Sequence, residues 1–141
     1  MQKTRSIPIV PMSEAGREDA GGAGEKPVSA APAAKTYRCR ITVLKCTYNQ
    51  ELADQYLADP KVGPCSLFRE GQSFVVDSTG FWKMLHGGFC SEAWDAISRY
   101  VYAALQGGSI MRGWTNDERM MITCCNDGVR PVIFRLERIE D

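Results

Sequence analysis

The stretch that decides the fold is MMITCCNDGVRPVIFRLERI, at residues 120–139. Both of its ends are rich in β-branched and other apolar residues, and the NDG at 126–128 between them is a strong turn signal. The pattern predicts a C-terminal β-hairpin. Apolar and charged residues alternate in the return strand, so one of its faces should be buried. The side chains expected to face the core are Val132, Phe134 and Leu136.

Two more strands are expected nearer the N-terminus. The run YRCRITVL at 37–44 is rich in β-branched residues, and SFVV at 73–76 follows a Glu-Gly turn signal. A period of two in the first run again gives one buried face. The residues expected on that face are Tyr37, Cys39, Ile41 and Val43.

Two helices are predicted between these strands. Asn49 is a suitable N-cap for a short helix at about 50–58, which an Asp-Pro pair would end. Ser91 is a suitable N-cap for a long helix at about 92–106, which a Gly-Gly pair would end. Apolar residues recur along the long helix at helical spacing, so one stripe should pack on the sheet. The members of that stripe are Trp94, Ile97, Val101 and Leu105.

These elements predict an α+β fold, in which a small and mostly antiparallel sheet packs against the long helix and the short one. We expect them to form a single domain over residues 36–141. Residues 1–35 differ in composition, because they hold four of the seven prolines and no aromatic residue. Such a segment cannot bury enough apolar surface to offset the entropy of ordering it. We therefore expect a disordered N-terminal tail.

The charge balance bears on partners and compartment. Seventeen basic residues offset seventeen acidic ones, so the chain has no long-range field that would attract nucleic acid or an anionic membrane. No apolar run approaches the roughly 18 residues that a membrane span needs. We expect neither nucleic acid nor a membrane as a partner. Prolines interrupt the short apolar stretch near the N-terminus, which argues against a signal peptide and predicts a cytoplasmic protein.

Six cysteines are the most informative residues for function. In a reducing cytoplasm they should be free thiols, and no C-x-x-C pair is present. Cys90 precedes the long helix, whose positive end stabilises an anion, so its thiol is a candidate for redox or metal chemistry. Cys65 lies in a Gly-Pro-Cys loop, where core packing explains it less easily. The alternative for either residue is a small buried hydrophobe.

Three further residues are candidates for the same site. His86 is the only histidine and lies four residues before Cys90. Cys124 and Cys125 are neighbours in a predicted strand and should point to opposite faces, so at most one of them is expected to join Cys65. Zinc and an iron–sulfur cluster are the cofactors considered for such ligands. The remaining cysteines, which we assign to the strand core, are Cys39 and Cys46.

Asp127 and Arg130 flank the predicted hairpin turn and are candidate ligand-binding residues. Arg130 would reach a carboxylate or phosphate, whereas in the simpler interpretation Asp127 shapes the turn and Arg130 is a solvated flank. The aromatic residues Phe81, Trp82 and Trp114 could line a pocket, but the preferred interpretation is that they cover the core. No P-loop, dinucleotide fingerprint, H-E-x-x-H or nucleophile elbow is present. The sequence leaves open whether the chain is an enzyme.

Several motifs taken together resemble a known family. They are GPC at 63–65, EGQSF at 70–74, GFCSEAW at 88–94 and CNDGVRPVIF at 125–134. On these motifs the chain is similar to an uncharacterised family of small cysteine-containing proteins, roughly 90 residues long and found mainly in anaerobic bacteria and archaea. The resemblance covers about 37–139, implies cysteines at the positions of Cys65 and Cys90, and implies no known activity. Ser66 stands where members often have proline.

Three functions are compatible with these observations, of which a small-molecule enzyme that uses Arg130 with a hydroxyl or carboxylate ranks last. In the leading hypothesis, Cys65 and Cys90, with Cys124 or Cys125, gather in one electropositive pocket and bind a soft metal or undergo redox chemistry. The alternative is a non-catalytic protein-binding module, which would hold a protein partner through a sheet edge or an exposed apolar patch. The positions of the sulfur atoms in the folded chain discriminate between the two.

Overall fold

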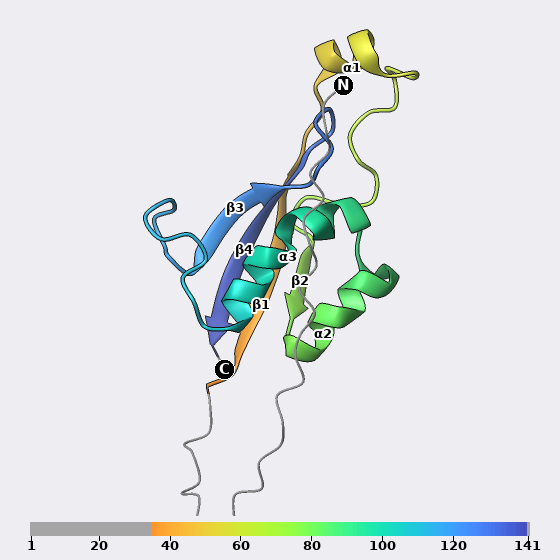
Figure 1. Cartoon of the computed structure of the whole chain (residues 1–141). Helices are drawn as coiled ribbons and strands as arrows, with labels where there is room; N and C mark the ends of the chain where they lie inside the picture. Colours follow the sequence, from red (N-terminus) through yellow and green to blue (C-terminus); the bar gives the residue numbers. More distant parts are fainter. Residues whose placement is uncertain (1–34, 141) are drawn as a thin grey trace, which may run out of the picture. The chain divides into compact units, whose positions relative to one another are not determined.

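The computed structural model describes residues 35–140. The tail predicted over 1–35 lies, apart from its last residue, outside the described residues. A four-stranded antiparallel sheet in the order β2-β1-β4-β3 forms the body of the described part (Figure 1). The strands are β1 (Tyr37–Cys46), β2 (Ser73–Val76), β3 (Met120–Cys124) and β4 (Val132–Glu140). The predicted α+β class and the C-terminal β3–β4 hairpin are confirmed.

The buried face of the sheet follows the alternation in the sequence. Ile41 in β1 lies opposite Leu136 in β4 and Phe74 in β2, and Val43 lies opposite Phe134. Fully burying an aliphatic or aromatic side chain of this size contributes about 1.5–3 kcal/mol. Strands β1 and β4 therefore hold the centre of the core. Their side chains with at most 1% exposure are Cys39, Ile41, Val43, Val132, Phe134 and Leu136.

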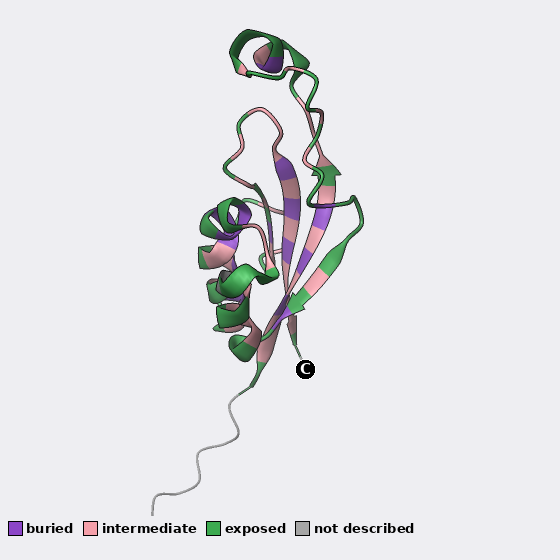
Figure 2. Cartoon of the chain, turned by 90° about the vertical axis from the view of Figure 1, so that its right-hand side faces the viewer, coloured by how far each residue is buried: buried purple, intermediate pink, exposed green. Residues whose placement is uncertain are grey.

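One long helix covers this face. The helix α3 (Ser91–Leu105) lies across the sheet, and only one side of it is buried (Figures 1 and 2). Cys90 is its N-cap, whereas the sequence suggested Ser91, and the helix begins and ends one residue earlier than expected. Helix boundaries commonly differ by this amount, because the terminal turns fray. Its buried residues are Ala93, Trp94, Ala96, Ile97, Val101 and Ala104.

The short predicted helix is present as α1 (Gln50–Tyr56), with Asn49 as its N-cap. The Asn49 Oδ1 atom accepts a hydrogen bond from the backbone N–H of Leu52 at 3.1 Å. The helix ends at Tyr56 instead of near residue 58, and Leu57 is already extended. Figure 1 shows α1 beyond the end of the sheet, so of the two predicted helices the long one alone packs on the sheet face.

A helical segment that the sequence did not predict precedes α3. It consists of α2 (Ser78–Lys83) and a π-helical turn η1 (Met84–Gly88). Three glycines in these eleven residues lower the helix propensity, which hides the segment from a periodicity search. Asp77 caps α2, and Gly87 adopts φ +87°, which breaks the helix before Phe89.

The opposite face of the sheet is not covered by any of the described helices (Figure 2). Arg40 on this face forms an ion pair with Glu137 at 3.5 Å, and the apolar side chains of Val75 and Ile122 are exposed.

Two tryptophans outside the sheet are exposed as well. Trp82 and Trp114 are 61% and 71% exposed, so the expectation that they cover the core is wrong. None of the helices within 35–140 is long and apolar enough to cross a membrane.

Candidate thiol site

Three cysteines from separate parts of the chain line one cavity. Cys65 belongs to the loop after α1, Cys90 precedes α3, and Cys125 follows β3. The cavity has a volume of about 210 Å³. Figure 1 shows the start of α3 and the β3–β4 loop at the same end of the sheet. The cavity is completed by the apolar residues Leu67, Phe68 and Val132 and the charged residues Glu92, Asp127 and Arg130.

Cys90 is placed by the start of α3. Its backbone is extended, at φ −65° and ψ 127°, and its carbonyl oxygen accepts the first helical hydrogen bond from Trp94 N at 2.8 Å. The Cys90 side chain makes no capping hydrogen bond. The half-buried sulfur therefore stands at the positive end of a fifteen-residue helix, where a negative charge is stabilised.

Cys125 is held by the first residue of β4. Its backbone N–H donates to the Val132 carbonyl oxygen at 3.2 Å, and the Val132 N–H donates to the Cys125 Sγ at 3.4 Å. Cys124 is the last residue of β3 and is exposed. Neighbouring strand residues point to opposite faces, which explains why the structure brings Cys125 and not Cys124 to the cavity.

Cys46 packs against the strand core, as the sequence predicted, and lies close enough to Cys65 and Cys125 to interact with them. It ends β1, lies opposite Val132, and its Sγ donates to the Phe68 carbonyl oxygen at 3.6 Å. Burial raises the pKa of the Cys46 thiol, and the nearby Glu70, Cys65 and Cys125 raise it further. A register shift between Val43 and Lys45 turns Cys46 toward the core side, and nothing in the β1 sequence signals that shift.

Asp127 and Arg130 form a hydrogen-bonded unit in the β3–β4 loop. The Asp127 Oδ1 accepts the backbone N–H groups of Val129 and Arg130 at 3.0 and 2.9 Å, and the Arg130 Nε donates to Asp127 Oδ2 at 2.9 Å. Partial burial acts to raise the pKa of Asp127, but the hydrogen bonds from Arg130 and Val129 outweigh it and leave that pKa below its usual value. Asp127 thus shapes the turn, as expected. Arg130 is a half-buried wall of the cavity and not a solvated flank.

The charges in the cavity differ from the expected electropositive pocket. Arg130 supplies one positive charge, and Glu92 and Asp127 supply two negative ones. Because Asp127 is paired with Arg130, the unbalanced charge is that of Glu92, which has no hydrogen bond or ion pair within the described chain. Cys65 and Cys90 line the same cavity, and they share it with the negatively charged side chain of Glu92.

The predicted metal ligands do not form a ligand set within the described residues. Over residues 35–140, no group of three or more His, Cys, Asp or Glu side chains is arranged to hold a metal ion. His86 is exposed in η1 and does not line the thiol cavity. Zinc and iron–sulfur binding normally need about four ligands around one point, so neither is supported by this arrangement.

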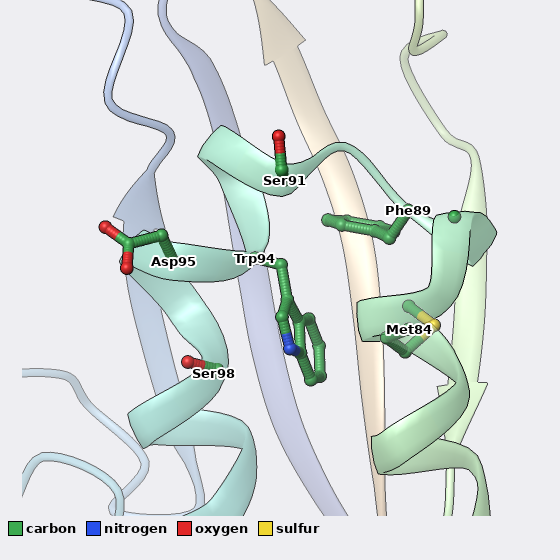
Figure 3. Close-up of a pocket in the computed structure, with 7 residues that line it drawn as sticks. Met84, Phe89, Ser91, Trp94, Asp95 and Ser98 are labelled. Carbon is green, nitrogen blue, oxygen red and sulfur yellow. The ribbon is translucent and has the colours of Figure 1, made fainter.

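A larger cavity of about 570 Å³ lies on the other side of the α3 start and contains no cysteine. Figure 3 shows the Trp94 indole between Met84 and Phe89 on one side and Asp95 and Ser98 on the other. Trp94 is only 2% exposed, and its Nε1 has no hydrogen-bond partner. The two cavities share no lining residue, and of the pair only the thiol site is lined by cysteines.

Comparison with known proteins adds no functional assignment. No family model, curated protein or solved structure matches this chain. The family resemblance inferred from the motifs stays a prediction. The function is therefore argued from the cavity itself.

Proposed function

We propose that the cavity is a thiol site whose cysteines are reversibly oxidised to a disulfide. The observation that carries the proposal is that Cys65, Cys90 and Cys125, from three distant segments, line one small cavity. All three are free and half-buried, so they are accessible to a small reactant and sheltered from bulk solvent. Such a site suits the reducing cytoplasm, where its resting state is the dithiol.

The reaction balances when a disulfide is the oxidant. One protein thiolate attacks a sulfur of the oxidant and forms a mixed disulfide, and the leaving thiolate takes up the proton that the protein thiol lost. A second protein thiolate then attacks the protein sulfur of the mixed disulfide. The protein gains one S–S bond, and the oxidant is released as two thiols. Cys90 is the proposed first nucleophile, because it stands at the positive end of α3.

Thiol counting tests this proposal. The full-length protein has six thiols, and equilibration with oxidised dithiothreitol should reduce the count by two, to four. Cys90→Ser should abolish the change, whereas Cys124→Ser, on the exposed neighbour outside the cavity, should leave one disulfide formed. If all six thiols of the native protein stay reduced both in oxidised dithiothreitol and in an excess of 2-hydroxyethyl disulfide, a stronger and likewise uncharged oxidant, the proposal is wrong.

Soft-metal binding is the second candidate, and one observation favours it. Glu92 places an unpaired carboxylate in the cavity of the three cysteines, and its negative charge attracts a cation. Equilibrium dialysis of the reduced protein against Zn²⁺, with Cys65→Ser as the comparison, measures this directly. Stoichiometric binding that the variant loses would place metal chemistry ahead of disulfide chemistry.

A non-catalytic protein-binding role rests on a different surface. The uncovered face of the sheet carries the exposed Val75 and Ile122, which a partner would bury. A stoichiometric protein partner that survives the double variant Cys65→Ser, Cys90→Ser and is lost in Ile122→Glu would favour this role over the thiol site.

A further inference from the structure

Two donor atoms of the Arg130 guanidinium are available to bind an anion. Its Nε is held by Asp127 at 2.9 Å, which fixes the plane of the group. Within the described chain, its two Nη atoms have no hydrogen-bond partner. Two Nη donors on one edge match the two oxygens of a carboxylate in the paired geometry that arginine favours. A ligand in the thiol cavity can therefore place a carboxylate against Arg130.

Glu92 offers the complementary charge in the same cavity. It lies in the first turn of α3, two residues after Cys90, and its carboxylate is unpaired. An ammonium group is the partner that an unpaired carboxylate binds best. The cavity thus combines three thiols with one arginine and one glutamate that each have charged atoms without a partner in the described chain.

The size of the cavity limits the ligand. About 210 Å³ is below the roughly 300–1,000 Å³ that holds drug-sized molecules, so an amino-acid-sized group fits. A second cavity of about 280 Å³ shares Asp127 and Arg130 with the first and is otherwise lined by Leu57, Ala58, Asp59 and Val62. A ligand made of two amino-acid halves can place one half in the thiol cavity and extend the other past Arg130.

From this arrangement we infer that the oxidant of the site is a small zwitterionic amino-acid disulfide, of which cystine is the simplest. The inference rests on the proposed thiol function and specifies its substrate class. The carboxylate of the reacting half binds Arg130, its ammonium binds Glu92, and its sulfur meets Cys90 or Cys65. The protein dithiol and one cystine give the protein disulfide and two cysteines, so atoms and electrons balance.

Three small disulfides that differ in the charged groups they carry test the inference. Cystine carries both charged groups, cystamine lacks the carboxylates, and 3,3′-dithiodipropionate lacks the ammonium groups. Each disulfide oxidises the full-length reduced protein at a measured rate. That rate is divided by the rate of the same disulfide with 2-mercaptoethanol, a neutral thiol, to correct for differences in intrinsic reactivity. After this correction, cystine should react about tenfold faster than either analogue, which corresponds to one charge-assisted contact.

Two variants should each change one of the two ratios of corrected rates, cystine to cystamine or cystine to 3,3′-dithiodipropionate. Arg130→Gln should remove the preference for cystine over cystamine, and Glu92→Gln should remove its preference over 3,3′-dithiodipropionate. Arg130→Lys, which keeps the charge and loses the paired geometry, should retain part of the first preference. Arg135→Gln is the matched control, because Arg135 lies on the opposite face of the sheet and pairs with Glu137 at 3.8 Å. It should change neither ratio.

The failures of the two proposals are distinguishable. Equal corrected rates for the three disulfides, or ratios that neither variant changes, would overturn the substrate class even if oxidised dithiothreitol closes the disulfide. If no disulfide oxidises the protein, including the uncharged oxidised dithiothreitol, the thiol function is wrong and the inference that rests on it is wrong as well.

Discussion

Removing the Asp127 carboxylate tests whether the β3–β4 loop is held as the structure shows. Asp127→Ala deletes three hydrogen bonds, two from backbone N–H groups and one from the Arg130 Nε. A net contribution of about 1 kcal/mol for each backbone bond, and up to about 1 kcal/mol for a side-chain pair that is about one-third exposed, gives a loss of about 2–3 kcal/mol. Asp127→Asn keeps an oxygen for the two backbone donors and should cost only about 1 kcal/mol.

Urea unfolding of the full-length chain at pH 7 measures both losses, and the m-value should not change. The pH dependence gives an independent check on the charge. Because the pKa of Asp127 is lowered in the folded chain, its ionised form stabilises the fold above the unfolded pKa of about 3.9. That stability is lost as the pH falls through the folded pKa. The gap between wild type and Asp127→Asn should therefore persist at pH 7 and close well below pH 4.

Either of two results would refute this reasoning. An Asp127→Ala variant within about 0.5 kcal/mol of wild type would show that the loop does not depend on the carboxylate. An Asp127→Asn variant as unstable as Asp127→Ala would show that the charge, and not the two backbone contacts, carries the effect.

Three further predictions concern the core, the end of α3 and Cys46. Phe134→Ala should destabilise the fold by about 3–5 kcal/mol in urea, because the side chain is fully buried, and a cost below 1 kcal/mol would contradict the central place of β4. Gly107→Ala should lower the melting temperature more than Gly113→Ala. Both glycines have a positive φ, but only at Gly107 would the new Cβ clash with the Tyr37 ring; equal losses would argue against that contact. Iodoacetamide should label Cys46 more slowly than the exposed Cys124 at pH 8, and Glu70→Gln should speed the labelling, since burial and Glu70 both raise the Cys46 pKa. Unchanged labelling in Glu70→Gln would remove the electrostatic part of this explanation.

The parts of the fold that the sequence predicted are those with a strong local period. The alternation around Phe134 and the helical stripe through Ile97 each place a buried face without knowledge of the rest of the chain. The α2–η1 segment was missed because its glycines oppose a helix that Asp77 capping and packing near α3 nevertheless stabilise. The exposed Trp82 shows that a large aromatic residue is not by itself evidence of burial.

The candidate site was likewise predicted only in part from the sequence. Strand parity indicated that only one of Cys124 and Cys125 would join Cys65 and Cys90, but the turn that selects Cys125 depends on its contacts with Val132. Cys46 packs against the core as predicted, but its place near Cys65 and Cys125 depends on a register shift in β1 that the sequence does not signal. The role of Arg130 depends on its pairing with Asp127 and on the loop that faces it across the cavity, and neither is visible in a linear sequence.

The most direct test of the account is to link the cysteines of the native protein with a short bifunctional thiol reagent, dibromobimane, and to map the linked peptides by mass spectrometry. Short links should join Cys65, Cys90 or Cys125 to one another, and none should include Cys124, which is exposed outside the cavity. Links that involve Cys124, or none among the three cavity cysteines, would contradict the claim that folding gathers these sulfurs into one site.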